Sequence, residues 1–426
     1  MAHVWTMLNG KILQKQCVFK QLKSCFTSHA IRGPRITNLS KNLIKNSKFL
    51  RSNTVNATAQ VGATADKSLN PKTQKYIGYW LFGCCGLVVG SVSLGGITRL
   101  TESGLSMTSW HLIRGMKPPR SEEEWLAEFE KYKECPEYKY SKLGMSLEEF
   151  KFIFYMEWAH RMWGRLVGVA FFLPAAFFWS KGWITKAMKP RLLIYGLLLG
   201  GQGLLGWYMV KSGLREDTMS MSTQAQPHVS QYRLAAHLGM AFALYSLMFW
   251  QGLAHVLKPE TMTVVSAKLS KLRGLSHGLV SLTFFTALSG AFVAGLDAGL
   301  TYNTFPKMAD RWIPTDLWAL SPWFKNLFEN PTTTQFNHRI LGTTTLAAIV
   351  AAWCLARPVA LPYRARMSVN LLLGMSFMQV GLGITTLLTY VPTSLAAAHQ
   401  LGSLTLLSIA LWFEYEMKLA AKFIPK

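Results

Sequence analysis

One stretch occurs twice in the chain and decides how it folds. It reads Glu157-Trp-Ala-His160-Arg161-Met-Trp-Gly164 in the first half and Gln335-Phe-Asn-His338-Arg339-Ile-Leu-Gly342 in the second. Three further segments recur in the same order: Glu102-Ser-Gly-Leu105 as Asp297-Ala-Gly-Leu300, Gln202-Gly-Leu-Leu-Gly206 as Gln379-Val-Gly-Leu-Gly383, and Leu234-Ala-Ala-His237 as the segment ending Ala397-Ala-His399. Because the matched residues are His, Arg, Gln and Gly, the pattern indicates an internal duplication.

Long apolar stretches surround these repeats. A helix needs about 20 apolar residues to cross a bilayer, and helices satisfy their backbone polar groups internally. Eight stretches qualify: 77–97, 154–179, 191–210, 233–256, 275–296, 337–356, 367–389 and 394–414. The chain is 50% hydrophobic and only 15% charged. We therefore predict an all-α polytopic membrane protein of two tandem, parallel-related four-helix bundles, residues 76–257 and 275–426, joined by a matrix linker at 258–274.

Charge sets the orientation of the spans. The net charge is +24, but much of the excess lies in residues 1–75, which are rich in Lys and Arg and contain one acid, Asp66. Such an arm is typical of a mitochondrial transit peptide and a disordered tail, so its charge does not indicate nucleic-acid binding. The basic linkers are 180–190, 257–274 and 357–366. Basic loops stay on the matrix side, which predicts a multi-pass protein of the mitochondrial inner membrane with both termini in the matrix.

Four histidines fall at matching places in the two repeats: His160, His237, His338 and His399. Each lies near the start of an even-numbered span, so all four lie at similar depth near the outer face. Ionisable groups at such depth are usually functional, and two imidazoles on facing helices can ligate one haem iron. Interhelical hydrogen bonding and zinc binding are alternatives, although other zinc ligands are sparse nearby. We predict one haem in each half.

Charged residues beside the histidines suggest different roles for the two halves. Arg161, Arg165 and Arg339 can pair with haem propionates, or they simply extend towards the membrane interface. Glu157 precedes the first repeat histidine by three residues and shares its helix face. Its counterpart Gln335 cannot titrate. This difference favours chemistry in the first half and electron transfer in the second, unless Glu157 only orients its neighbour Arg161.

Longer segments resemble the haem A synthase family over nearly the whole chain after residue 75. The most specific are Gly95 to Met107, Glu157 to Gly168, Gln202 to Val210, Gln231 to His237 and Phe336 to Gly342. The mitochondrial form is the more similar, given the basic arm. The resemblance implies oxidation of the C8 methyl group of haem O to a formyl group, giving haem A for cytochrome c oxidase.

The resemblance also implies roles for individual residues. It places the substrate haem with His160, His237, Arg161 and Arg165. It places a haem b cofactor with His338, His399 and Arg339, and it makes Glu157 catalytic. Bacterial relatives often carry a cysteine pair in outward loops, whereas this chain has only Cys135 there, so a thiol role in haem transfer is in doubt.

The implied partners are a membrane haem O synthase that supplies the substrate, an electron donor or acceptor such as a ferredoxin, and cytochrome oxidase assembly factors. The sequence leaves a homo-oligomer open. The main alternative function is a diheme b-type membrane electron-transfer protein. It is less suitable because all four histidines lie near one face. A transporter built on tandem repeats is a second alternative, and it requires a site near the membrane midplane.

Overall fold

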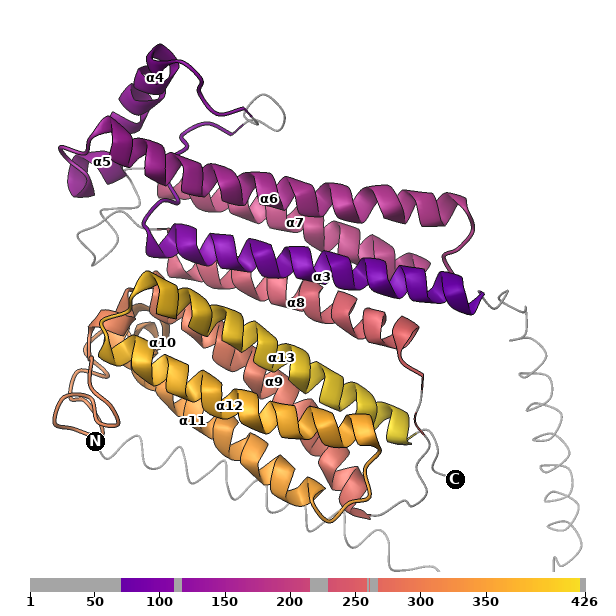
Figure 1. The fold of residues 1–426 in the computed structure, drawn as a ribbon. Helices are drawn as coiled ribbons and strands as arrows, with labels where there is room; N and C mark the ends of the chain where they lie inside the picture. Colours follow the sequence, from indigo (N-terminus) through magenta and orange to yellow (C-terminus); the bar gives the residue numbers. More distant parts are fainter. Residues whose placement is uncertain (1–69, 111–116, 215–228, 259, 261–266, 422–426) are drawn as a thin grey trace, which may run out of the picture. The chain divides into compact units, whose positions relative to one another are not determined.

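The computed structural model describes residues 70–110, 117–214, 229–258, 260 and 267–421 (Figure 1). Within these ranges the chain forms helices and no β-sheet, and eight helices are long and apolar enough to cross a membrane. They are α3 (Pro71–Leu100), α6 (Leu147–Ser180), α7 (Lys189–Gly213), α8 (Gln231–Val256), α9 (Ala267–Gly295), α11 (Pro331–Ala356), α12 (Tyr363–Leu388) and α13 (Thr393–Ala421). The prediction of an all-α protein with eight spans is confirmed. Residues 1–69, most of the expected arm, lie outside the described residues.

Several helices are longer than the apolar stretches that predicted them. Helix α3 begins at Pro71, where the Asn70 side chain accepts a hydrogen bond from Lys72 N at 3.0 Å. Helix α6 begins at Leu147, with a reciprocal capping box between Ser146 and Glu149. Such capping bonds satisfy the free N–H groups of a first turn and start a helix in polar surroundings. Hydropathy detects only the part of a helix that can lie in hydrocarbon, so the expected boundaries fell short.

Helix contacts join the spans into two sets of four. In the first half α3 packs on α6 and α8, and α7 packs on α6 and α8; in the second half α9 packs on α11 and α13, and α12 packs on α11 and α13 (Figure 1). The two sets meet where α8 contacts α9, α13 contacts α3, and α8 contacts α13. In both the α8–α9 and the α13–α3 contact, the fourth helix of one half packs on the first helix of the other half. An approximate two-fold axis between the halves would relate these two contacts.

Apolar side chains lie both inside and outside these helices. One buried cluster includes Phe171, Phe242 and Met248 of the first half, and another includes Leu372 and Phe413 of the second. The largest exposed apolar residues of the spans lie on outward faces of α6, α7, α12 and neighbouring helices. An exposed apolar helix face is expected of a membrane span, because lipid is as apolar as the protein interior.

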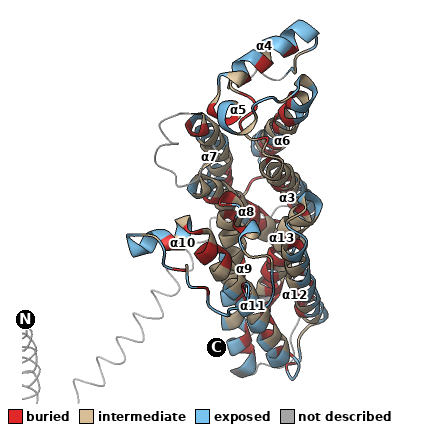
Figure 2. Ribbon diagram, turned by 90° about the vertical axis from the view of Figure 1, so that its left-hand side faces the viewer, coloured by how far each residue is buried: buried red, intermediate tan, exposed pale blue. Residues whose placement is uncertain are grey.

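The segment between α3 and α6 contains two short helices that the hydropathy pattern does not predict, α4 (Glu122–Lys133) and α5 (Pro136–Ser141). Trp125, Phe129 and Tyr132 form one buried face of α4 and pack against Phe150 and Phe154 of α6. The rest of α4 is mostly exposed (Figure 2), and most of its residues are Glu or Lys. Because most of its other residues are Glu or Lys, the hydropathy of α4 is low and does not reveal this three-residue apolar face. In the second half the corresponding loop contains only η3 (Ala298–Leu300), η4 (Trp323–Lys325) and α10 (Asn326–Glu329).

The turn after the first helix of each half has the same unusual backbone. Glu102 has φ 49° and Asp297 has φ 48°, and these two residues match in the repeat. A residue in the left-handed region commonly ends a helix. Arg99 at the C-terminal end of α3 forms an ion pair with Asp297, which follows α9, at 3.0 Å, and this pair ties the two halves together.

Candidate functional site

The first pair of repeat histidines lies in one cavity. His160 comes from α6 and His237 from α8, and both line the cavity wall. A glycine faces each ring. A methyl group at Gly95 of α3 would lie 2.8 Å from His160 Cε1, and one at Gly206 of α7 would lie 3.5 Å from His237 Cε1. The missing side chains let the neighbouring helices come close to the imidazoles and fix where each ring can lie.

The second pair repeats this arrangement with His338 on α11 and His399 on α13. Here the glycines are Gly290, whose added methyl would lie 3.2 Å from His338, and Gly383, whose added methyl would lie 2.7 Å from His399. The two ring centroids are 6.3 Å apart and the ring planes cross at 87°. Imidazole nitrogens bind transition metals at roughly 2.0–2.1 Å, so two rings on opposite sides of one ion have centroids about 6 Å apart. The pair therefore has the separation that axial ligation of one iron requires.

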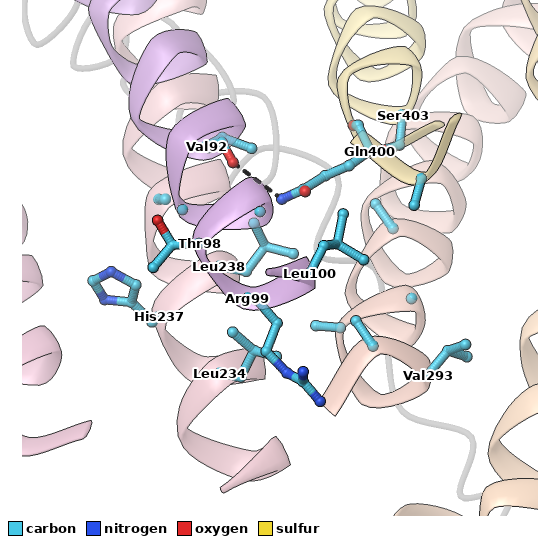
Figure 3. Close-up of a pocket in the computed structure, with 18 of the residues that line it drawn as sticks. Val92, Thr98, Arg99, Leu100, Leu234, His237, Leu238, Val293, Gln400 and Ser403 are labelled. Atoms are coloured by element: carbon cyan, nitrogen blue, oxygen red, sulfur yellow. Dashed lines mark hydrogen bonds between the residues drawn. The ribbon is translucent and has the colours of Figure 1, made fainter. Parts of the chain in front are cut away.

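Both histidine pairs open into one cavity of about 1270 Å³. Its wall is mainly apolar and runs through the seam between the halves. Leu234, Leu238 and Val293 line the cavity together with Gln400 of α13, whose Nε2 donates to Val92 O at 3.3 Å (Figure 3). Pockets for single small ligands usually measure about 300–1,000 Å³. The cavity exceeds that range, as two large flat ligands would require.

The four histidines lie at different distances from the starts of their helices. His237, His338 and His399 lie in the second turn of α8, α11 and α13. His160 lies further along its helix, in the fourth turn, because α6 begins at Leu147 and extends beyond the expected span.

The donor set fits a haem iron better than a bare metal ion. Among the described residues, no group of three or more His, Cys, Asp or Glu side chains is placed to hold a metal. A structural zinc site needs four such ligands, whereas a haem supplies four nitrogens of its own and needs only two axial ligands. Two imidazoles that line an apolar cavity, each with a glycine of a neighbouring helix opposite it, can satisfy that need in each half.

The Nδ1 atoms of the histidines have different surroundings in the two halves. In the second half His338 Nδ1 lies 2.7 Å from Ser289 Oγ, and His399 Nδ1 lies 3.2 Å from Gln379 Nε2. In the first half Nδ1 of His160 and of His237 is buried and has no hydrogen-bond partner within the described parts of the chain. The sequence analysis matched the histidines but did not detect this difference.

Glu157 is buried and fully engaged. Its Oε2 accepts hydrogen bonds from Ser106 Oγ at 2.7 Å and from Met107 N at 2.8 Å, and its Oε1 forms an ion pair with Arg161 at 2.6 Å. The carboxylate thus ties the outer loop after α3 to α6. Glu157 also lines the cavity, so it is placed both to hold the loop and to act on a ligand.

Gln335 holds the matching loop of the second half by donating hydrogen bonds, whereas Glu157 holds its loop by accepting them. Its Nε2 donates to Ala298 O at 2.8 Å and to Tyr302 O at 3.1 Å, while its Oε1 accepts from Arg339 at 3.1 Å. The second loop presents carbonyl acceptors where the first presents N–H and O–H donors. The exchange of carboxylate for amide therefore has a structural reason, in addition to the catalytic one that the sequence suggested.

The predicted arginines line the cavity and hold its outer rim. Arg161 donates to Ser109 O at 2.9 Å and stacks on Trp110, and Arg339 donates to Tyr302 O at 2.9 Å. The Nε–H groups of both arginines are buried without a partner within the described residues. Arg165 donates to Arg161 O at 3.1 Å. In each half, a haem propionate would be a suitable acceptor for the unsatisfied Nε–H group. Propionate binding by these arginines stays a prediction.

A second carboxylate, which the sequence analysis missed, lines the same cavity. Glu137 of α5 is buried and accepts a hydrogen bond from Tyr132 Oη at 2.8 Å. Burial raises the pKa of Glu137 to about 7; the Tyr132 hydrogen bond and Lys142 lower it, and Glu157 and Glu102 raise it further. A lone Glu in a charged loop gave no sequence signal of burial.

Cys135, the residue left in doubt by the sequence, is half-buried, and its Sγ donates to Lys131 O at 3.7 Å. Burial, followed by the nearby Glu137 and Glu134, raises its pKa to about 11. A thiolate is the reactive form of cysteine, so these surroundings disfavour thiol chemistry at neutral pH.

Comparison with known proteins gives consistent results. The model of the COX15-CtaA family, described as a cytochrome oxidase assembly protein, matches residues 78–411. The chain is 56% identical to heme A synthase COX15 of Homo sapiens over 349 residues, which cover 82% of this chain and 84% of that protein. It is 46% identical to heme A synthase COX15 of Arabidopsis thaliana over 377 residues, 87% of this chain and 82% of that protein. It is 47% identical to heme A synthase of the bacterium Nitrosospira multiformis over 345 residues, 81% of this chain and 94% of that protein.

Proposed function

The chain belongs to the COX15-CtaA family of cytochrome oxidase assembly proteins, and we propose that it is a haem A synthase that oxidises the C8 methyl group of haem O to a formyl group. The observation that carries the proposal is the pair of matched histidine sites in one cavity. Each site has two imidazoles on facing helices and a glycine opposite each ring.

We assign haem O, the substrate, to His160 and His237, and haem b, the cofactor, to His338 and His399. Support comes from the two carboxylates that line the first site, Glu157 and Glu137, because a protein group that exchanges protons is needed where the carbon is oxidised. The second site has Gln335 at the position of Glu157. Haem b, when bound, supplies one-electron redox chemistry.

Protons must move during the reaction, since the methyl carbon loses two hydrogens on the way to the formyl group. Glu157 is the residue proposed to accept or relay these protons. The ion pair with Arg161, at 2.6 Å, holds its carboxylate at the cavity wall. Arg161, Arg165 and Arg339 are proposed to orient the propionates.

The cellular setting is also a proposal. The protein spans a membrane several times, and its eukaryotic relatives and basic matrix-side linkers support the mitochondrial inner membrane, with both termini in the matrix and residues 1–75 as transit peptide and arm. A haem O synthase, an electron-transfer partner such as a ferredoxin, and oxidase assembly factors are the proposed partners.

Mass spectrometry of haems extracted from the purified protein, produced with and without haem O, tests the function. We expect haem A only when haem O is supplied. His160→Ala and His237→Ala should abolish haem A but keep haem b, whereas His338→Ala and His399→Ala should deplete haem b. A wild-type protein that holds two haems and leaves supplied haem O unchanged would instead be a diheme electron-transfer protein.

A further inference from the structure

The two haem sites differ in how firmly the first histidine of each is held. In the second half Ser289 of α9 donates its hydroxyl proton to Thr286 O at 2.7 Å, and the same oxygen lies 2.7 Å from His338 Nδ1. A hydroxyl has one proton to give. Since that proton goes to Thr286 O, the serine oxygen accepts from His338 Nδ1–H.

With the Ser289 proton given to Thr286 O, this contact favours the His338 tautomer that carries its proton on Nδ1. A neutral imidazole carries one proton, so a proton on Nδ1 leaves the Nε2 lone pair free to bind a metal. The contact also stops rotation of the ring. Hydrogen bonds to the distal nitrogen of a metal-binding histidine typically change metal affinity by about 10–100-fold when they are removed.

The first half lacks this support. Gly95 and Gly290 occupy matching positions, each facing the first histidine of its half, and the residues that precede them are Leu94 and Ser289. Leu94 offers no side-chain acceptor, and His160 Nδ1 is buried without a partner among the residues described. The ring of His160 is therefore held by packing alone.

We propose that Ser289 is a positioning residue that retains the haem of the second half, and that Leu94 at the matching place leaves the haem of the first half exchangeable. This inference rests on the proposed function. A cofactor haem stays through many reaction cycles, while a substrate haem has to enter and its product has to leave in each one. The Ser–Leu difference would contribute to different haem lifetimes at the two sites.

Haem release into excess apomyoglobin, followed by absorbance with the purified detergent-solubilised protein, tests the second half. We expect Ser289→Ala to release haem b about 10–100-fold faster than the wild type. Ser289→Thr keeps a hydroxyl and should restore slow release. The midpoint potential of haem b gives a second measurement, because a Nδ1–H donated to an acceptor makes imidazole a stronger electron donor. Ser289→Ala should raise this potential and Ser289→Thr should not.

The first half allows the reverse experiment. Leu94→Ser places a hydroxyl beside His160, with Ser91 O three residues earlier to take its proton, as Thr286 O does for Ser289. Leu94→Ala opens the same space without the hydroxyl and is the matched control. Haem O should leave the Leu94→Ser variant about 10–100-fold more slowly than the Leu94→Ala variant, and haem A should accumulate in it unreleased.

These outcomes separate the inference from the function on which it rests. Equal haem b release and equal potentials in wild type and Ser289→Ala, in a protein that still makes haem A, would overturn the retention role alone. Equal haem O release from Leu94→Ser and Leu94→Ala would overturn the exchange role. A wild type that binds haem but never forms haem A would refute the proposed function, while haem b release from the Ser289 variants would still decide the retention role.

Discussion

Glu137→Gln should remove a pH-dependent weakness of the outer helices α4 and α5. The pKa of Glu137 is raised from 4.5 to about 7, mainly by burial. When α4 and α5 open, Glu137 becomes exposed and its pKa returns to about 4.5. Between pH 4.5 and about 7 the closed state therefore holds a proton that the opened state has released. The free energy of opening falls as pH rises through this range and is constant above it. A pKa change of this size corresponds to roughly 3 kcal/mol. Glutamine stays neutral and can still accept the Tyr132 hydrogen bond.

Hydrogen exchange measured by mass spectrometry on peptides from residues 121–141 is the assay. After correction for the intrinsic rate, wild-type protection should fall by about 100-fold between pH 4.5 and 7.5, and the Glu137→Gln variant should show little change. Glu134→Gln, at an exposed position on the same segment, is the control and should behave like the wild type. If Glu137→Gln keeps the full wild-type pH dependence, burial of Glu137 does not raise its pKa and our reasoning about this carboxyl is wrong.

Two further predictions concern the cavity. Gly383→Ala places a methyl group 2.7 Å from His399 and should deplete haem b in pigment spectra, whereas Gly381→Ala, on an exposed face of the same helix, meets nothing within 4 Å and should keep it; equal haem contents would contradict the close approach. Glu157→Gln leaves the buried Arg161 without its counter-ion and should cost about 3–5 kcal/mol of stability as well as haem A formation. An unchanged thermal unfolding midpoint would show that this ion pair does not stabilise the fold.

The sequence predicted the membrane spans well, because length and hydropathy are local properties that the bilayer imposes directly. It did not predict their ends. The capping box at Ser146 lies in a polar segment that hydropathy excludes, and it adds about two turns to α6 before the apolar stretch that predicted this helix. Helix α4 was missed for a similar reason, since only Trp125, Phe129 and Tyr132 form its buried face.

Within the site, the repeat identified the residues that can bind metal but not the atoms that orient them. The histidines were found because each occurs twice at the same register. Ser289 and Leu94 also lie at matching positions, yet a Ser–Leu pair carries no signal without knowing that one contacts Nδ1 of a histidine. Glu137 reaches the cavity only because α5 folds back towards Glu157, which sequence separation does not show.

The Glu157–Gln335 pair shows why a chemical difference between repeats needs its partners to be interpreted. In sequence, a carboxylate against an amide suggests that one half catalyses and the other does not. In the structure each side chain matches its own loop, because Met107 N–H needs an acceptor and the carbonyl of Ala298 needs a donor. Loop polarity alone would therefore favour Glu in one half and Gln in the other, even without catalysis. The case for chemistry at Glu157 rests instead on its position in the cavity wall, close enough to Glu137 for its charge to raise the pKa of that carboxyl.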